Sequence, residues 1–133
     1  MSNFNIVNKS TKNKNTKNNN PKSIEQNSIW MCSMGHDGIV GHEQKGNRPF
    51  YVISNTKYNN SSKTPIGFFL STSSKKKGNR FTYDVDMQGT LENVNISQIR
   101  TISADRFFRF MGTGTNEDTK ELMNMFSEII VNI

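Results

Sequence analysis

Residues 66–72, IGFFLST, are apolar from Ile66 to Leu70 and turn polar only at Ser71. A continuous apolar run of this length, bounded by turn-forming residues, is typical of a strand that is buried on both faces. We therefore predict a central strand over Ile66–Thr72 whose C-terminal end emerges at the surface.

Short segments rich in β-branched and aromatic residues lie on both sides of this run, separated by Gly, Asn, Ser and Pro. Between Phe81 and Met87 apolar and polar residues alternate, which indicates a strand with one solvated face. Further strands are expected over Ser28–Met34, Pro49–Ser54, Arg80–Met87, Leu91–Ile96 and Gln98–Ile102. Many short strands with such turns predict a mainly β domain, a small barrel or sandwich.

The sequence TNEDTKELMNMFSEIIVNI, residues 115–133, predicts a helix that packs across the sheet. Thr115 and Asp118 have the spacing of a capping box, and acidic residues suit a helix N-terminus. Five apolar residues recur at helical spacing on one stripe. They are Leu122, Met123, Phe126, Ile129 and Ile130. We expect this Met-rich stripe to be core or a subunit contact, with a peptide-binding groove as the alternative.

Residues 1–27 hold nine Asn, five Lys and one acidic residue, with few apolar side chains. Such a segment cannot bury enough apolar surface to offset its ordering entropy, so we predict a disordered tail and a folded domain over 28–133. The tail is either an extension without function or a polycationic arm for nucleic acid. It supplies +4 of the net charge of +6. It lacks the apolar core of a signal peptide and no later segment is long enough to span a membrane, so we expect a cytoplasmic protein without membrane contact.

The chain has one cysteine, Cys32, which excludes an intrachain disulfide. The two histidines, His36 and His42, do not have the spacing of zinc ligands with it. No metal and no cofactor is expected.

Two polar segments adjoin strand ends: GHEQKGNR, residues 41–48, and STSSKKK, residues 71–77. Neighbouring antiparallel strands can bring the start of one beside the end of the other, so Arg48 and Thr72 are expected to meet. Pro49 pushes Arg48 into an extended conformation and suits the first position of a strand. We therefore expect Arg48 to be held in place.

A guanidinium binds two phosphate oxygens at once and can stabilise the charge that develops on a phosphorane. RNA brings its own nucleophile, the 2′-OH, so an enzyme that cleaves it needs positioning and charge stabilisation most. Thr72 can donate a hydrogen bond to a phosphoryl oxygen, and His42 can exchange a proton near neutral pH. Each residue has a simpler interpretation: Arg48 paired with Glu43, an ordinary loop histidine, and a threonine that ends a strand.

The segments SIWMCSM, GHEQKGNRPFYVISN, YNN, LSTSSK and SQIRTIS, in this order, resemble the MazF/PemK family of toxin endoribonucleases over residues 28 to about 131. The resemblance implies a small SH3-like barrel of the MazF/PemK/CcdB type with a C-terminal helix, mainly β. It also implies a homodimer that binds single-stranded RNA, and a cognate antitoxin whose acidic segment covers the cleft. The expected reaction is sequence-specific, metal-independent cleavage by 2′-OH attack, giving a 2′,3′-cyclic phosphate and a 5′-OH.

The same resemblance places catalysis on Arg48 and Thr72, with help from His42. It implies RNA contacts for the two loops and for the second motif, in which Arg100 has a structural or a catalytic role. These RNA-contact candidates are Glu43, Gln44, Lys45, Asn47, Ser73, Ser74, Lys75, Lys76, Lys77, Arg80 and Gln98.

One departure concerns the PemK branch, which has Arg-x-Asp just before the Gln of the second motif. Asn95 and Ser97 stand there in this chain, so the acid-base work of that branch does not transfer. Two alternatives remain: a non-catalytic RNA-binding barrel, which the missing acidic residue at position 97 favours, and a gyrase-poisoning toxin of the CcdB type, which would have the same barrel.

Overall fold

A computed structural model of the chain describes residues 23–35, 46–72 and 81–131. Its strands are β1 (Ser28–Ser33), β2 (Asn47–Val52), β3 (Ile66–Thr72), β4 (Thr82–Met87), β5 (Thr90–Asn95), β6 (Arg100–Thr101) and β7 (Phe107–Thr113). Its helices are α2 (Thr56–Ser62), the 3-10 turn η1 (Ala104–Arg106) and α3 (Asn116–Val131).

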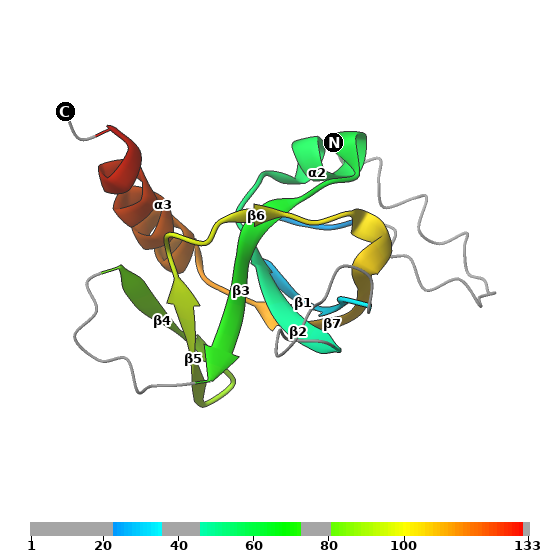
Figure 1. The fold of residues 1–133 in the computed structure, drawn as a ribbon, viewed down its shortest axis with the longest axis horizontal. Coiled ribbons are helices and arrows are strands. Elements are labelled where there is room, and N and C mark those ends of the chain that lie inside the picture. The colour runs from blue at the N-terminus through cyan, green and yellow to red at the C-terminus, as the bar shows by residue number, and fades with distance from the viewer. Residues whose placement is uncertain (1–22, 36–45, 73–80, 132–133) are drawn as a thin grey trace.

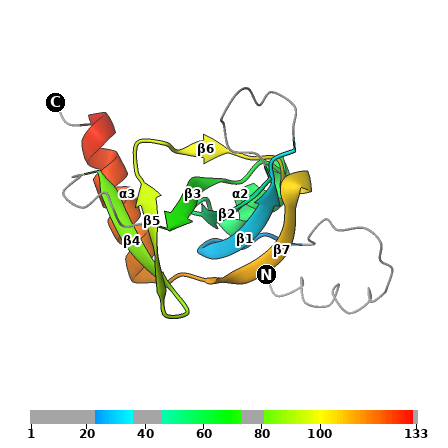
Figure 2. The same ribbon diagram turned by 60° about the horizontal axis from the view of Figure 1, so that its bottom comes forward.

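The strands form one antiparallel sheet in the order β4-β5-β3-β2-β1-β7, with β6 paired to β3. The sheet curls into a partial barrel, and α3 lies beside β4 and β5 (Figures 1 and 2). β3 is central, because it pairs with β2 at Phe50↔Phe69 and with β5 at Leu70↔Val94. This confirms the predicted mainly β fold with a C-terminal helix.

The close approach of β2 and β3 depends on Gly67. A Cβ atom at this position would lie 1.8 Å from the backbone oxygen of Tyr51, so no other residue fits without a backbone shift. Gly67 also pairs with Arg100 of β6. The glycine therefore lets β3 contact both neighbours where it bends between them.

Both faces of the sheet are covered. On the inner face, Phe68 and Leu70 of β3 pack with Tyr51 of β2 and with Leu122 and Phe126 of α3. On the outer face, a second cluster forms around Phe50, Val52 and Phe107, and Ile24 and Ile102 cover it. Because side chains alternate along a strand, Arg48 lies on the same face of β2 as Phe50 and Val52.

All six predicted strands are present, and β3 has the predicted bounds. The sequence did not reveal β7, whose pairing with β1 is interrupted by two register shifts that break its alternation. It did not reveal α2 either, because this helix is polar. The helix depends on Asn55 as N-cap and on the buried Asn59. The side-chain amide of Asn59 donates to the backbone oxygens of Ile24 and Ser54.

The predicted capping box of α3 is confirmed: the Asp118 amide donates to Thr115 Oγ1 (2.9 Å), and the Thr115 amide donates to Asp118 Oδ2 (3.2 Å). The predicted apolar stripe is only partly core. Leu122 is buried, whereas Met123, Ile129 and Ile130 are 39%, 38% and 63% exposed. The reason is that the C-terminal part of α3 extends past the sheet, as Figure 1 shows.

The folded region includes residues 23–27, although the composition of residues 1–27 predicted a disordered tail. Ile24 is buried in the outer cluster, Gln26 Nε2 donates to the Ile53 oxygen (2.8 Å), and the Asn27 amide donates to the Val52 oxygen (2.9 Å). Residues 1–22 lie outside the described part of the chain. Within that part, no helix has the length and apolar character needed to cross a membrane.

Candidate functional site

Arg48 is the second residue of β2, and its Cα pairs with that of Cys32 in β1. The side chain is partly buried, and its guanidinium carbon lies 4.7 Å from the centre of the Phe69 ring in β3. A guanidinium at this distance from an aromatic face is attracted by the ring quadrupole. The expectation that Arg48 is held in place is therefore met by an aromatic platform as well as by its position in a strand.

Arg100 reaches the same ring from the other side of β3. It begins β6, pairs with Gly67, and its guanidinium carbon lies 5.5 Å from the Phe69 centroid. Residues 48 and 100 are thus 52 positions apart in sequence but share one aromatic contact. The fold brings two positively charged side chains together.

This juxtaposition acts on the ionisation of Arg48. Burial first, and the positive charge of Arg100 second, lower the pKa of the Arg48 guanidinium. An arginine nevertheless keeps its charge at neutral pH. Among residues 23–35, 46–72 and 81–131, no carboxylate pairs with Arg48, so its Coulombic environment is one of repulsion. An anion placed between the two guanidiniums would relieve it.

Thr72 ends β3, where its Cα pairs with that of Glu92 in β5. The paired residues of β2 and β3 run from Val52↔Gly67 to Phe50↔Phe69, which places the start of β2 and the end of β3 at the same end of neighbouring strands. The side chain of Thr72 is not described. Since Phe69 shares the face of Arg48, regular alternation along β3 assigns position 72 to the opposite face. The meeting of Arg48 with the Thr72 hydroxyl therefore stays a prediction, and it requires β3 to depart from this alternation at its end.

Two further predicted RNA contacts are described. Asn47 is exposed at the start of β2, next to Arg48. Gln98 is exposed two residues before Arg100, and its backbone N–H donates to the backbone oxygen of Asn95 (3.1 Å). Both adjoin an arginine of the pair along the chain. The remaining candidates lie outside the described residues: His42, Glu43, Gln44, Lys45, Ser73, Ser74, Lys75, Lys76, Lys77 and Arg80.

Asn95 and Ser97, which replace the Arg-x-Asp of the PemK branch, bond to each other. Asn95 Oδ1 accepts from both the amide (3.1 Å) and the hydroxyl (2.9 Å) of Ser97. These bonds shape the turn that leads from β5 to β6. The two residues therefore position the strand that carries Arg100.

Phe69 is the site residue that the sequence did not reveal, because it stands inside an apolar run and resembles a core residue. The available signal was alternation: Phe68 and Leu70 point to the inner core, so Phe69 must face the other side. For metals, the described part of the chain contains no group of three or more His, Cys, Asp or Glu that could hold an ion.

Comparison with known proteins identifies the family of the chain. Residues 25–130 match the family described as PemK-like, MazF-like toxin of type II toxin-antitoxin system. Among curated proteins, none matches the chain.

Solved structures share the fold at low sequence identity. MazF from Deinococcus radiodurans superposes with a TM-score of 0.67 at 17% identity, over 81% of this chain and 96% of that one. A MazE-MazF complex from the same organism gives 0.65 at 15% identity, over 82% and 96%. An endoribonuclease in complex with its cognate antitoxin, from a mycobacterial species, gives 0.62 at 15% identity, over 78% and 91%.

Proposed function

Because the chain belongs to the PemK-like, MazF-like toxin family of type II toxin-antitoxin systems, we propose that it is a toxin that cleaves single-stranded RNA in a sequence-specific manner in the cytoplasm. The observation that supports this most is the Arg48–Phe69–Arg100 arrangement. Two guanidiniums on one ring, without a described carboxylate partner for Arg48, suit a backbone phosphate.

In the proposed reaction the 2′-oxygen of the RNA attacks the adjacent phosphorus. The new P–O bond forms as the bond to the 5′-oxygen of the next nucleotide breaks, which gives a 2′,3′-cyclic phosphate and a 5′-OH. His42 accepts the proton of the 2′-OH, and Arg48 donates a proton to the departing 5′-oxygen. Proton exchange with water then deprotonates His42 and reprotonates Arg48.

Arg48 has three roles in this scheme. Its charge stabilises the extra negative charge of the phosphorane, and its N–H groups donate to the non-bridging oxygens together with the Thr72 hydroxyl. The lowered pKa of Arg48 also makes it a better proton donor to the 5′-oxygen than an ordinary arginine. Arg100 binds the same or the neighbouring phosphate, and the guanidiniums supply the positive charge without a metal ion.

The proposed partners follow from the same charges. A cognate antitoxin with an acidic segment would neutralise Arg48 and Arg100 and so block the RNA, and the mycobacterial neighbour forms a complex with its own antitoxin. We also propose a homodimer, which would present two such sites.

The experiment is to incubate the purified protein with a long defined transcript, with and without EDTA. Cleavage at a small set of sites, unaffected by EDTA, is expected. An intact transcript that binds with salt-dependent affinity would show a non-catalytic RNA-binding barrel. Inhibition of gyrase without any RNA cleavage would show a toxin of the CcdB type.

A further inference from the structure

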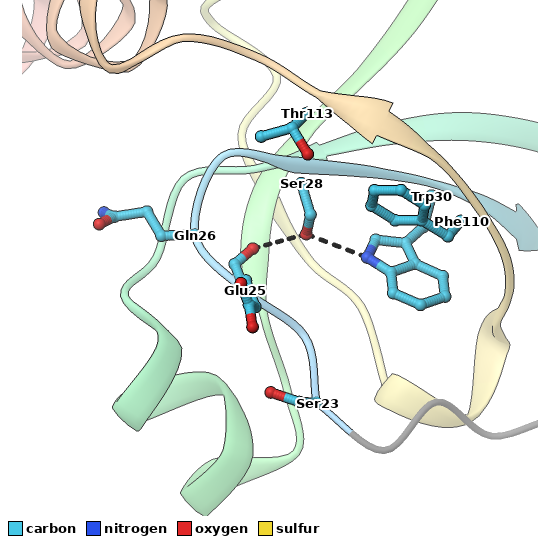
Figure 3. Close-up of a pocket in the computed structure, with 7 residues that line it drawn as sticks. All are labelled: Ser23, Glu25, Gln26, Ser28, Trp30, Phe110 and Thr113. Carbon is cyan, nitrogen blue, oxygen red and sulfur yellow. Dashed lines mark hydrogen bonds between the residues drawn. The ribbon is translucent and has the colours of Figure 1, made fainter. Parts of the chain in front are cut away.

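A pocket of about 290 Å³ lies between residues 23–28, β1 and β7 (Figure 3). Its lining does not include Arg48, Phe69 or Arg100. Both aromatic and polar side chains line it. They are Ser23, Glu25, Gln26, Ser28, Trp30, Phe110 and Thr113. This volume is close to the lower end of ligand-binding pockets.

The aromatic wall of the pocket is fixed in orientation. Trp30 Nε1 donates to Ser28 Oγ (3.0 Å), and Ser28 Oγ in turn donates to the backbone oxygen of Glu25, as the dashed lines in Figure 3 show. The rings of Trp30 and Phe110 meet edge to face with centroids 5.4 Å apart. Phe110 is nevertheless 53% exposed, so a flat ligand could still cover it.

The pocket lies on the same face of the sheet as Arg48. A row of ring contacts runs from Phe69 through Phe50, Phe107 and Trp30 to Phe110, and no centroid separation along it exceeds 6.1 Å. The row starts at the ring that carries Arg48 and ends in the pocket. An RNA strand with a phosphate at Arg48 could therefore place a base a few nucleotides away in the pocket.

Charge selects among the groups that RNA could offer. Glu25 lines the pocket and its carboxylate repels phosphate, so the base is the better occupant. Guanine is the base whose Watson–Crick edge offers two adjacent N–H donors, which suit the two oxygens of a carboxylate. A cationic side chain would also suit Glu25 and the rings. However, residues 1–22, which lead directly into Ser23, carry five lysines and no acidic residue, which favours RNA over a cationic partner.

We propose that this pocket binds an unpaired guanine of the RNA, stacked on Trp30 and Phe110 and hydrogen-bonded to Glu25. The proposal rests on the proposed function as an RNA-binding toxin. It assigns part of the sequence preference to a site separate from Arg48.

The test uses Trp30, which is the single tryptophan of the chain, as a fluorescent reporter. The full-length protein is titrated with the 2′-O-methyl trinucleotides UGU, UAU, UCU and UUU, which lack the 2′-OH nucleophile and so are not cleaved. We expect saturable quenching by UGU with an affinity about tenfold above the other three. Stacking on an aromatic side chain typically contributes about 1–3 kcal/mol per base, so Phe110→Ala should weaken UGU binding about tenfold.

Glu25→Gln should weaken UGU binding about fivefold and so reduce its advantage to about twofold, because an amide presents a single acceptor beside a donor. Phe108→Ala is the matched control, since Phe108 is exposed on the same strand but does not line the pocket. Equal quenching by all four trinucleotides would overturn the proposal. Quenching by acetylated tri-arginine amide, with none by RNA, would overturn it in favour of protein docking. Either result leaves the cleavage assay unaffected, so the two proposals fail separately.

Discussion

The Phe69 ring fixes where the two guanidiniums lie, so its removal should reduce activity without loss of the fold. Phe69→Leu keeps an apolar contact with Phe50, whose ring centroid is 5.0 Å away, but removes the aromatic face under Arg48. A cation–π contact contributes about 0.5–1 kcal/mol at an exposed site, so we expect the single-turnover cleavage rate to fall about two- to fivefold. Phe69→Tyr, which keeps the ring, should retain the rate. Equal rates in all three proteins would show that the ring does not position Arg48.

Arg100 is predicted to contact a phosphate. Each such contact to a single strand contributes about 0.7 to the slope of log affinity against log salt, so Arg100→Gln should lower the slope by about that amount. Lys120→Gln is the control, because Lys120 is exposed on α3, which packs on the opposite face of the sheet. A slope unchanged by Arg100→Gln would place this residue outside the RNA contact.

Helix α3 depends on its N-terminal cap for part of its stability. Thr115→Ala removes the hydroxyl that accepts from the Asp118 amide, and such a loss costs about 1 kcal/mol. The free energy of unfolding by urea should fall by that amount, with the cleavage rate unchanged. Asn124→Ala, at an exposed position of the same helix, should have little effect. A loss of cleavage in the Thr115 variant would indicate that α3 takes part in the active site.

Two tyrosines that hydrogen-bond to α3 should make the free energy of unfolding depend on pH in the alkaline range. Burial raises the pKa of Tyr51 to about 12, and its hydroxyl lies 2.7 Å from Thr119 Oγ1. Burial and the hydrogen bond to Asp118 also raise the pKa of Tyr83 to about 12.

Because both phenols are more acidic in the unfolded chain, with a pKa of about 10, their contribution is complete below pH 10 and is lost as the pH rises to 12. The free energy of unfolding should decline over this range. Tyr51→Phe should make the decline shallower, and an identical pH profile in this variant would contradict the assignment.

How well the sequence predicted each element depended on how local its signal is. β3 and the capping box of α3 were predictable because an apolar run between turn residues and a pair three positions apart are both local patterns. β7 was not, because its bulges are set by the pairing with β1, and α2 was not, because the bonds of Asn59 reach Ile24, 35 positions away. The same holds for the site. Arg48 could be predicted from its place next to Pro49, whereas its contact with Phe69 depends on the tertiary fold and could not.

The positive charge of the chain is concentrated in residues 1–22. The chain has 17 basic and 11 acidic residues, and five of the lysines but no acidic residue lie in 1–22, so residues 23–133 carry a net charge of +1. If the N-terminal segment is an RNA-binding arm, its deletion should lower the salt slope of RNA binding by up to about 3.5 and weaken binding at low salt. Cleavage at saturating RNA should persist, because Arg48 and Arg100 remain. An unchanged slope would show that the extension has no part in RNA binding.

The most direct measurement compares the single-turnover cleavage rate of Arg48→Ala with that of the unmodified protein, on one defined transcript in the presence of EDTA, with the product ends identified by mass spectrometry. Loss of a donor to the developing charge typically costs 10²- to 10³-fold in rate. We therefore expect the unmodified protein to give 2′,3′-cyclic phosphate ends, and the variant to unfold at a similar temperature but to cleave at least about 100-fold more slowly. A folded Arg48→Ala protein that cleaves at the original rate would contradict the assignment of the active site.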